Sequence, residues 1–198
     1  MKNLIKMKLL IVALLTTIVI NATNINNKVK VEVISSKLID LKLENSDGDL
    51  TIRVKDVFGE VLYTEKFEGN YISKKYDLNT LPEGNYYFEI EGRTKINLMP
   101  FKISSKGCEF KSDIESTYYK PIVRQEGDLV FISKIEFKKE DFEIYLYDNQ
   151  LNSLYQEKLN GGINLGKTLN IKNLKSGNYS IVMKSAGRVF EQKIYKKK

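Results

Sequence analysis

The 198-residue chain contains no histidine and no tryptophan, and it has one cysteine and three prolines. Without histidine, no Ser-His-Asp or Cys-His catalytic arrangement can form, and no His-containing zinc or haem site. Carboxylate-only and serine–lysine mechanisms remain open. The lone Cys108 cannot form a disulfide within the chain. We expect it to be a small, buried or half-buried strand residue, and a reactive thiol or an intermolecular bridge is the alternative.

Long apolar runs are also scarce, and the one at residues 9–20 follows a positive segment containing Lys2, Lys6 and Lys8. Twelve residues suit the core of a signal peptide and fall short of the roughly 20 that a membrane span needs. We therefore predict a signal peptide over residues 1–22, cleaved after Ala22, and an exported protein in the periplasm, at the cell surface or outside the cell. An uncleaved N-terminal anchor is the alternative.

The formal net charge of +7 is unevenly distributed. Acidic and basic residues balance over residues 23–107, whereas basic residues outnumber acidic ones over residues 114–198. Neither half has the dense basic stripe with interleaved aromatic residues that nucleic-acid binding requires. We therefore expect no nucleic-acid partner, and we expect the more basic half to face any partner.

The chain is rich in sequence patterns that are typical of β-strands. Apolar and polar residues alternate with a period of two over residues 50–55, 86–91 and 142–147, and turn signals separate such runs. No segment after the predicted signal peptide shows a convincing helical period. Turns spaced by about 8–12 residues are typical of an all-β sandwich.

An internal repeat organises these strands. The motif Leu-x-x-Gly-Asn-Tyr at residues 81–86 recurs at 174–179, and residues 56–69 match 148–161 with an offset smaller by one. We interpret Leu81 and Leu174 as plugs at the bottom of a sandwich. Each motif ends in a tyrosine that resembles a tyrosine corner, with a buried ring and a hydroxyl bonded to the backbone: Tyr86 and Tyr179.

The repeat predicts two tandem Ig-like antiparallel β-sandwiches, module one over residues 27–107 and module two over 114–198. Residues 104–124 are expected to hold the last strand of the first module and the first strand of the second. This segment is not a Gly/Ser-rich linker, so we expect the modules to pack against each other rather than move freely.

The segment 161–168, Gly-x-x-x-x-Gly-Lys-Thr, matches the phosphate-binding P-loop letter for letter. A working P-loop opens a helix, and residues 169–174 are too few for one before the next turn. They also align with a strand and turn of module one. We therefore predict a β-hairpin loop and no nucleotide partner.

Residues 45–49, Asn-Ser-Asp-Gly-Asp, have some features of a calcium loop but lack the other ligands of an EF-hand and have no counterpart in module two. A plain hairpin turn is the prediction. The remaining carboxylates are scattered, mostly at outward-facing strand positions where we expect solvent. The sequence therefore assigns no catalytic, cofactor-binding or metal-ligating residue, and no cofactor.

Two motifs resemble a known family. Residues 56–62, Asp-Val-Phe-Gly-Glu-Val-Leu, resemble a hairpin of the Por secretion tail, the C-terminal sorting domain of proteins exported by the type IX system of Bacteroidetes. The ending at 174–179, followed by Gly187 and a lysine tail, is similar to that family's terminal motif. The whole chain resembles short secreted flavobacterial proteins with a duplicated layout. In module two, residues 148–152 lack the glycine of the hairpin.

The resemblance implies that module two is a sorting signal read by outer-membrane secretion machinery. The first functional hypothesis is a non-catalytic exported protein, not an enzyme, whose modules act in secretion sorting or cell-surface assembly, with that machinery or another surface protein as partner. We expect membrane contact only through the signal peptide during export. The alternative is an adhesion, carbohydrate-binding or protein-binding module that uses exposed aromatic residues: Tyr87, Tyr145 and Tyr147.

Overall fold

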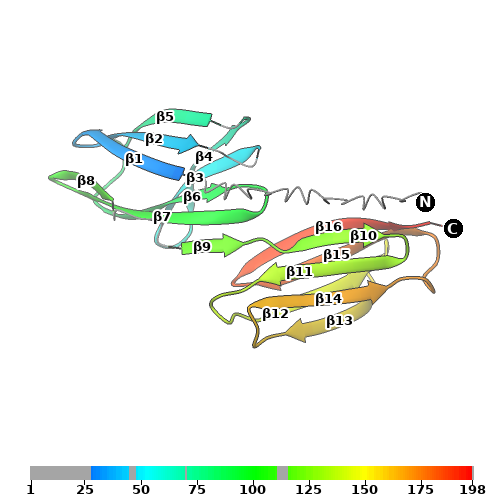
Figure 1. The fold of residues 1–198 in the computed structure, drawn as a ribbon. Coiled ribbons are helices and arrows are strands. Elements are labelled where there is room, and N and C mark those ends of the chain that lie inside the picture. The colour runs from blue at the N-terminus through cyan, green and yellow to red at the C-terminus, as the bar shows by residue number, and fades with distance from the viewer. Residues whose placement is uncertain (1–27, 45–47, 70, 111–115, 198) are drawn as a thin grey trace, which may run out of the picture.

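The computed structural model describes residues 28–44, 48–69, 71–110 and 116–197, and every regular element in them is a β-strand (Figure 1). All pairings between these strands are antiparallel, so the predicted all-β class is confirmed. No helix capable of crossing a membrane occurs in these four ranges. The predicted signal peptide lies outside them.

Two sheets build the first sandwich. The smaller sheet has the order β1-β2-β5 and comprises β1 (Lys28–Ser35), β2 (Leu38–Glu44) and β5 (Tyr71–Asp77). The larger has the order β4-β3-β6-β7-β8, with β9 also paired to β7. Its strands are β3 (Leu50–Asp56), β4 (Val61–Phe67), β6 (Gly84–Glu91), β7 (Lys95–Ser104), β8 (Gly107–Phe110) and β9 (Ser116–Tyr119).

The second sandwich repeats this plan with fewer strands. One sheet has the order β10-β11-β14 and comprises β10 (Ile122–Glu126), β11 (Leu129–Ile135) and β14 (Asn164–Asn170). The other has the order β13-β12-β15-β16. Its strands are β12 (Phe142–Tyr147), β13 (Ser153–Leu159), β15 (Gly177–Ser185) and β16 (Arg188–Lys196).

Each sandwich has its own hydrophobic core, formed by the inward positions of the predicted alternation. Phe88 is fully buried at the centre of the first core, and Phe142 at the centre of the second. Leu81 and Leu174 are partly buried and pack against the core of their own sandwich, as the repeat predicted. Burial of such side chains contributes about 1.5–3 kcal/mol each, which makes the two cores the main source of stability.

The strands between the modules differ from the prediction. A second module that starts at residue 114 would include β9, but residues 116–119 of β9 pair with residues 95–98 of β7 in the first sandwich. Strand β8 also pairs with β7 and extends past residue 107. The first strand of the second sandwich is β10, so the segment predicted to be shared contributes two strands to the first sandwich before the chain crosses over.

The tyrosine corners are confirmed in both copies. The Tyr86 hydroxyl donates to the Pro82 carbonyl at 2.9 Å, and the Tyr179 hydroxyl donates to the Lys175 carbonyl at 2.7 Å. Both rings are buried. Each hydroxyl reaches back by four residues, so a buried aromatic ring keeps its polar group satisfied while it closes the turn before β6 or β15.

A second shared device is a polar clasp at the sheet edges. In the first sandwich, the Tyr63 hydroxyl donates to Glu65 at 2.7 Å, and Lys74 of the facing sheet pairs with Glu65 at 3.0 Å. The clasp thus joins β4 to β5 across the open side of the sandwich. The second sandwich has the same three side chains on β13 and β14: Tyr155, Glu157 and Lys167.

The hairpins β3–β4 and β12–β13 have the same turn, but they differ in the residue that occupies the turn position with a positive φ. Asp56 and Asp148 each accept two backbone N–H groups of their own turn through Oδ1. Gly59 has a φ of 86°, and Leu151, at the equivalent position, has a φ of 64°. The hairpin glycine missing from module two is therefore replaced by a leucine that is forced into the left-handed region.

We expect Leu151→Gly to raise the free energy of unfolding by about 0.5–1 kcal/mol. The left-handed conformation costs a non-glycine residue roughly 1–2 kcal/mol, and the greater freedom of glycine in the unfolded chain offsets part of the gain. Leu151 is 79% exposed, so little packing is lost. The reverse change, Gly59→Leu, should destabilise by about 1–2 kcal/mol. Thermal and urea unfolding would measure both, and a destabilised Leu151→Gly would contradict this account.

Candidate functional site

The two sandwiches meet where the turn of the last hairpin, β15–β16, lies against the outer face of the larger sheet of the first sandwich. Ala186 and Gly187 form this turn with φ values of 49° and 71°. Positive φ at both central residues is the type I′ geometry, which matches the twist of the flanking strands. The turn places Arg188, the first residue of β16, beside strand β6.

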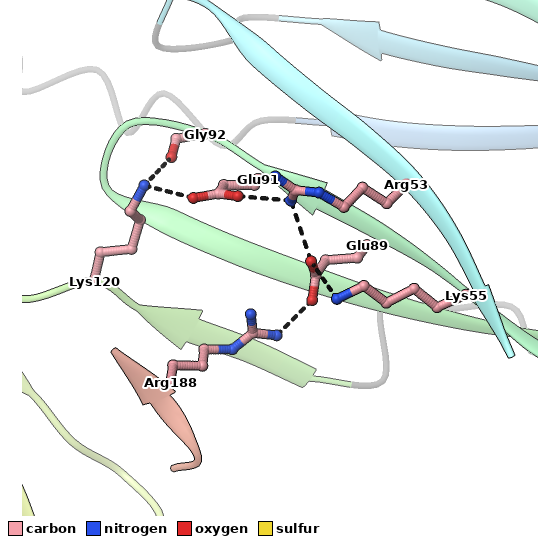
Figure 2. Close-up of polar contacts among 7 residues, drawn as sticks. All are labelled: Arg53, Lys55, Glu89, Glu91, Gly92, Lys120 and Arg188. Atoms are coloured by element: carbon pink, nitrogen blue, oxygen red, sulfur yellow. Dashed lines mark hydrogen bonds and ion pairs between the residues drawn. The ribbon is translucent and has the colours of Figure 1, made fainter. Parts of the chain in front are cut away.

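Glu89 on β6 is the centre of the contact (Figure 2). One carboxylate oxygen accepts from Arg53 at 3.2 Å and from Lys55 at 2.8 Å, both on the neighbouring strand β3. The other accepts from Arg188 of the second sandwich at 2.6 Å. The Glu89 side chain is only 3% exposed. A carboxylate with three cationic donors is stable at such a position, whereas an unpaired one would not be.

Glu91, two residues further along β6, extends the cluster. It pairs with Arg53 at 2.7 Å and with Lys120 at 2.8 Å. The Lys120 ammonium also donates to the Gly92 carbonyl at 3.2 Å. Lys120 lies between β9 and β10, so the segment that joins the sandwiches is itself held against the first one.

Strand geometry explains why these charges lie together. Arg53 is directly opposite Glu89 in the antiparallel register of β3 and β6. Side chains two residues apart share a face, which places Lys55 and Glu91 beside this pair. The alternation of residues 86–91 therefore aligns the carboxylates on the outer face, where Arg188 of the second sandwich contacts Glu89.

Burial and hydrogen bonding act in opposite directions on the two carboxyl groups. Burial on its own would raise the pKa of Glu89, but hydrogen bonds from Lys55 and Arg188 outweigh it and hold that pKa below its ordinary value. The pKa of Glu91 is also lowered, because bonds from Lys120 and Arg53 outweigh its burial. Both groups are thus ionised at neutral pH and poorly suited to donate a proton in catalysis.

An aromatic contact lies next to the cluster. The Tyr118 ring of β9 stacks on Phe190 of β16, with centroids 5.7 Å apart and planes within 10° of parallel. The Arg188 guanidinium lies 5.5 Å from the Tyr118 centroid, and the Lys134 ammonium lies 4.8 Å from it. Burial raises the pKa of Tyr118 to about 12, so its ring stays neutral between these cations.

A cleft of about 230 Å³ opens beside this contact, lined by residues of β9, β11 and the β15–β16 turn. Two of the cations in its wall are already paired, Lys134 with Glu136 and Arg188 with Glu89. Lys138 and Glu140 also line it. Lys134 and Glu136 are both buried. The ion cluster therefore has the character of a docking interface between the two sandwiches, in which charges neutralise one another.

The tyrosines proposed as a binding surface are less accessible than predicted. Tyr87, Tyr145 and Tyr147 are half-buried, so the prediction that they are exposed is wrong. The rings of Tyr145 and Tyr147 stack on each other with centroids 6.1 Å apart, and Lys184 lies 5.0 Å from the Tyr145 centroid. Neighbouring side chains therefore cover much of the area on which a ligand could stack.

The P-loop-like segment is confirmed to lack the required helix. Gly166, Lys167 and Thr168 lie within strand β14, and Lys167 pairs with Glu157 at 2.8 Å. The segment is not a hairpin loop either, because β13 and β14 belong to different sheets and the connection crosses between them.

Cys108 is buried in β8, as expected, and burial raises its pKa to about 11. Of the calcium-like segment, residues 45–47 lie outside the described residues. Across the described ranges, no cluster of three or more Cys, Asp or Glu side chains could hold a metal ion.

The cluster was not predicted from the sequence, because the outward carboxylates were expected to lie in solvent. The repeat contained a usable signal, since the four charged positions on β3 and β6 differ in character from their equivalents in the second sandwich. Arg53, Lys55, Glu89 and Glu91 correspond to Tyr145, Tyr147, Val182 and Lys184. Two copies of a sandwich that share core residues but differ in the residues on one outer face are expected to have different neighbours at that face.

A family model described as the secretion system C-terminal sorting domain matches residues 16–99 and, separately, residues 131–197. The two matches together span most of the chain. The chain belongs to this family.

The resemblance to the Por secretion tail is thereby confirmed, and one match to the sorting domain falls on most of each sandwich. The second match includes the whole β15–β16 hairpin. Membership in this type IX secretion family makes the chain an exported protein, directed to the cell surface or the extracellular space. No curated protein matches the chain in sequence.

Solved structures similar to this chain include the BSP domain of a biofilm associated protein, with 13% identity, a TM-score of 0.30, and coverage of 85% of this chain and 29% of that one. The FN1–FN3 domains of chicken CNTN1 have 14% identity, a TM-score of 0.31, and coverage of 86% and 65%. The receptor tyrosine kinase Torso has 13% identity, a TM-score of 0.26, and coverage of 88% and 74%. The chain thus spans under two thirds of the first two.

Removing Arg188 should loosen the contact between the two sorting-domain sandwiches. We expect Arg188→Ala to weaken it by about 1.5–3 kcal/mol, the usual contribution of a hydrogen bond to a charged group. Thermal unfolding and small-angle scattering would show a lower Tm and a more extended particle. Arg124→Ala is the matched control, because its pair with Glu126 is exposed and should contribute less than about 1 kcal/mol. Equal effects of the two changes would refute this role for Arg188.

The contact should also weaken in acid. The pKa of Glu89 is lower in the folded protein than its ordinary value of 4.5, so its ionisation stabilises the fold fully above that pH. This stabilisation is lost as the pH falls through the lowered pKa. Thermal unfolding between pH 7 and pH 3 should therefore show that the Tm of the wild type falls more steeply with pH than the Tm of Glu89→Gln, which has no carboxyl at this position to protonate. Parallel profiles would exclude Glu89 as the cause.

Proposed function

We propose that this is a non-catalytic exported protein whose second sandwich is the sorting signal for type IX secretion. The observation that carries the proposal is the second family match, which runs from within β11 to the end of β16 and so covers most of the second sandwich. The machinery of the outer membrane would be the partner, and neither nucleotide nor nucleic acid is part of the proposal.

The first sandwich has the same fold but a different environment, which supports a division of roles. Its β7 edge is covered by β8 and β9, and its outer face is covered at Glu89 by the second sandwich. We propose that it is the passenger of the signal. The boundary that fits the strand pairing lies between β9 and β10, at residues 120–121.

The predicted signal peptide supplies the first step of this route. We propose that residues 1–22 direct the chain across the inner membrane and are removed after Ala22. The second sandwich then directs passage across the outer membrane. The destination, at the cell surface or in the medium, depends on that machinery.

Deleting residues 174–198 should abolish the appearance of the protein outside the cell while leaving the periplasmic pool intact, because the deletion removes β15 and β16. Fractionation and immunoblotting in a host with type IX secretion would measure both pools. The repeat offers a matched control: deletion of residues 81–105, the equivalent segment of the first sandwich. We expect this control to retain export. Equal export of both deletions would refute the assignment of the signal to the second sandwich.

A further inference from the structure

The two sandwiches differ at the outer edge of one strand. In the sheet order β13-β12-β15-β16, strand β16 is last, and within the described ranges no strand pairs with its outer edge. Its equivalent is β7, because Tyr86 faces Phe101 in β6–β7 as Tyr179 faces Ile194 in β15–β16. Strand β7 is paired on both sides, with β6 on one and with β8 and β9 on the other.

One side chain shows how the edge of β16 can be paired. The backbone N–H of Tyr195 donates to the Gln125 carboxamide oxygen at 3.2 Å, and the Gln125 carboxamide nitrogen donates to the Tyr195 carbonyl at 2.8 Å. This is the exchange of two bonds that a residue of a neighbouring antiparallel strand would make. The backbone groups of Tyr195 therefore point away from β15, and those of residues 189, 191 and 193 follow with the period of two.

The side chains at these positions are exposed and can be contacted by another chain. Val189 is 64% exposed and Tyr195 is 50% exposed. Glu191, Gln192 and Lys193 are exposed as well. A long, exposed edge with apolar residues is a site where another strand can add, and proteins usually protect such edges.

We propose that β16 pairs antiparallel with β16 of a second copy of this chain, about a twofold axis at Gln192. In this register Val189 faces Tyr195 of the other copy, and Glu191 faces Lys193. On pairing, the backbone of Val189 replaces the Gln125 carboxamide as the partner of the Tyr195 N–H and carbonyl, so both bonds are kept. The pairing is isologous, so each favourable pair occurs twice. Opposite charges and apolar–aromatic pairs directly across from each other stabilise antiparallel strands.

The charges select this register among its neighbours. A shift by two residues in one direction puts Glu191 opposite its own copy, and a shift in the other direction puts Lys193 opposite its own copy. Like charges directly across from each other are destabilising. A shift by one residue would instead exchange the two faces of the strand. Of these three registers, only the one about Gln192 places opposite charges directly across from each other.

This dimer does not depend on the proposed sorting role, since it uses the strand edge of the folded chain alone. A strand of a different protein could use the same edge, and the experiment below separates that case, because only self-pairing links Glu191 of one copy to Lys193 of another.

The test uses charge-reversed variants of the full mature chain in analytical ultracentrifugation over a range of concentrations. We expect the wild type to dimerise, and Glu191→Lys alone or Lys193→Glu alone to raise the dimer dissociation constant at least tenfold. An equimolar mixture of the two variants should dimerise again, because each copy then restores the charge that the other has lost. Lys66→Glu, the same substitution on edge strand β4, is the control and should leave the dimer unchanged.

A second measurement fixes the register. Gln192→Cys should form a disulfide between two copies under mild oxidation, because residues on the axis face each other at about 4.5 Å between Cα atoms, within disulfide reach. Lys66→Cys should not cross-link. A wild type that stays monomeric, single variants that dimerise as well as the wild type, or a mixture that stays monomeric would each overturn the proposal.

Discussion

The arrangement of the two sandwiches depends on one buried carboxylate. Glu89 is removed from water only because three cations surround it, and one of these, Arg188, comes from the other sandwich. An ion pair at such a site contributes less through its own attraction than through the cost of leaving either charge alone. The contact is thus specific. A different placement of the second sandwich would leave Glu89 covered without its third partner, or exposed beside Arg53 and Lys55 of its own sheet.

The duplication separates what the fold requires from what each copy does. The tyrosine corners, the aspartate-bonded hairpins and the Tyr-Glu-Lys clasps are present in both sandwiches, and each satisfies polar groups or closes an edge. The outer faces of the larger sheets have diverged, with an ion cluster in one copy and stacked tyrosines in the other. The strand after the corner also differs, since β7 is covered on both sides whereas β16 has one edge without a strand in the described ranges.

The last hairpin therefore has several roles in one element. Its turn contacts the first sandwich through Arg188, its inner face completes the second core through Ile181, and its edge is held at one point by Gln125. The combination of these three contacts in one hairpin has a consequence for any partner of the sorting domain. Any partner that engages β16 at its edge meets a strand whose position is already fixed at the turn by the ion cluster and at the other end by a glutamine.

Local and periodic features were readable from the sequence by itself. Alternation set the inward faces of residues 50–55, 86–91 and 142–147, and the repeat predicted both tyrosine corners. The sequence also showed that residues 148–152 lack the hairpin glycine. These features depend on neighbours within a few residues. The tertiary structure alone decided three things: β9 pairs with the first sandwich, Glu89 is buried rather than solvated, and no strand of the described ranges pairs with the outer edge of β16. Each depends on residues that are tens of positions apart in the chain, and a pattern of period two distinguishes inside from outside without showing what covers the outside.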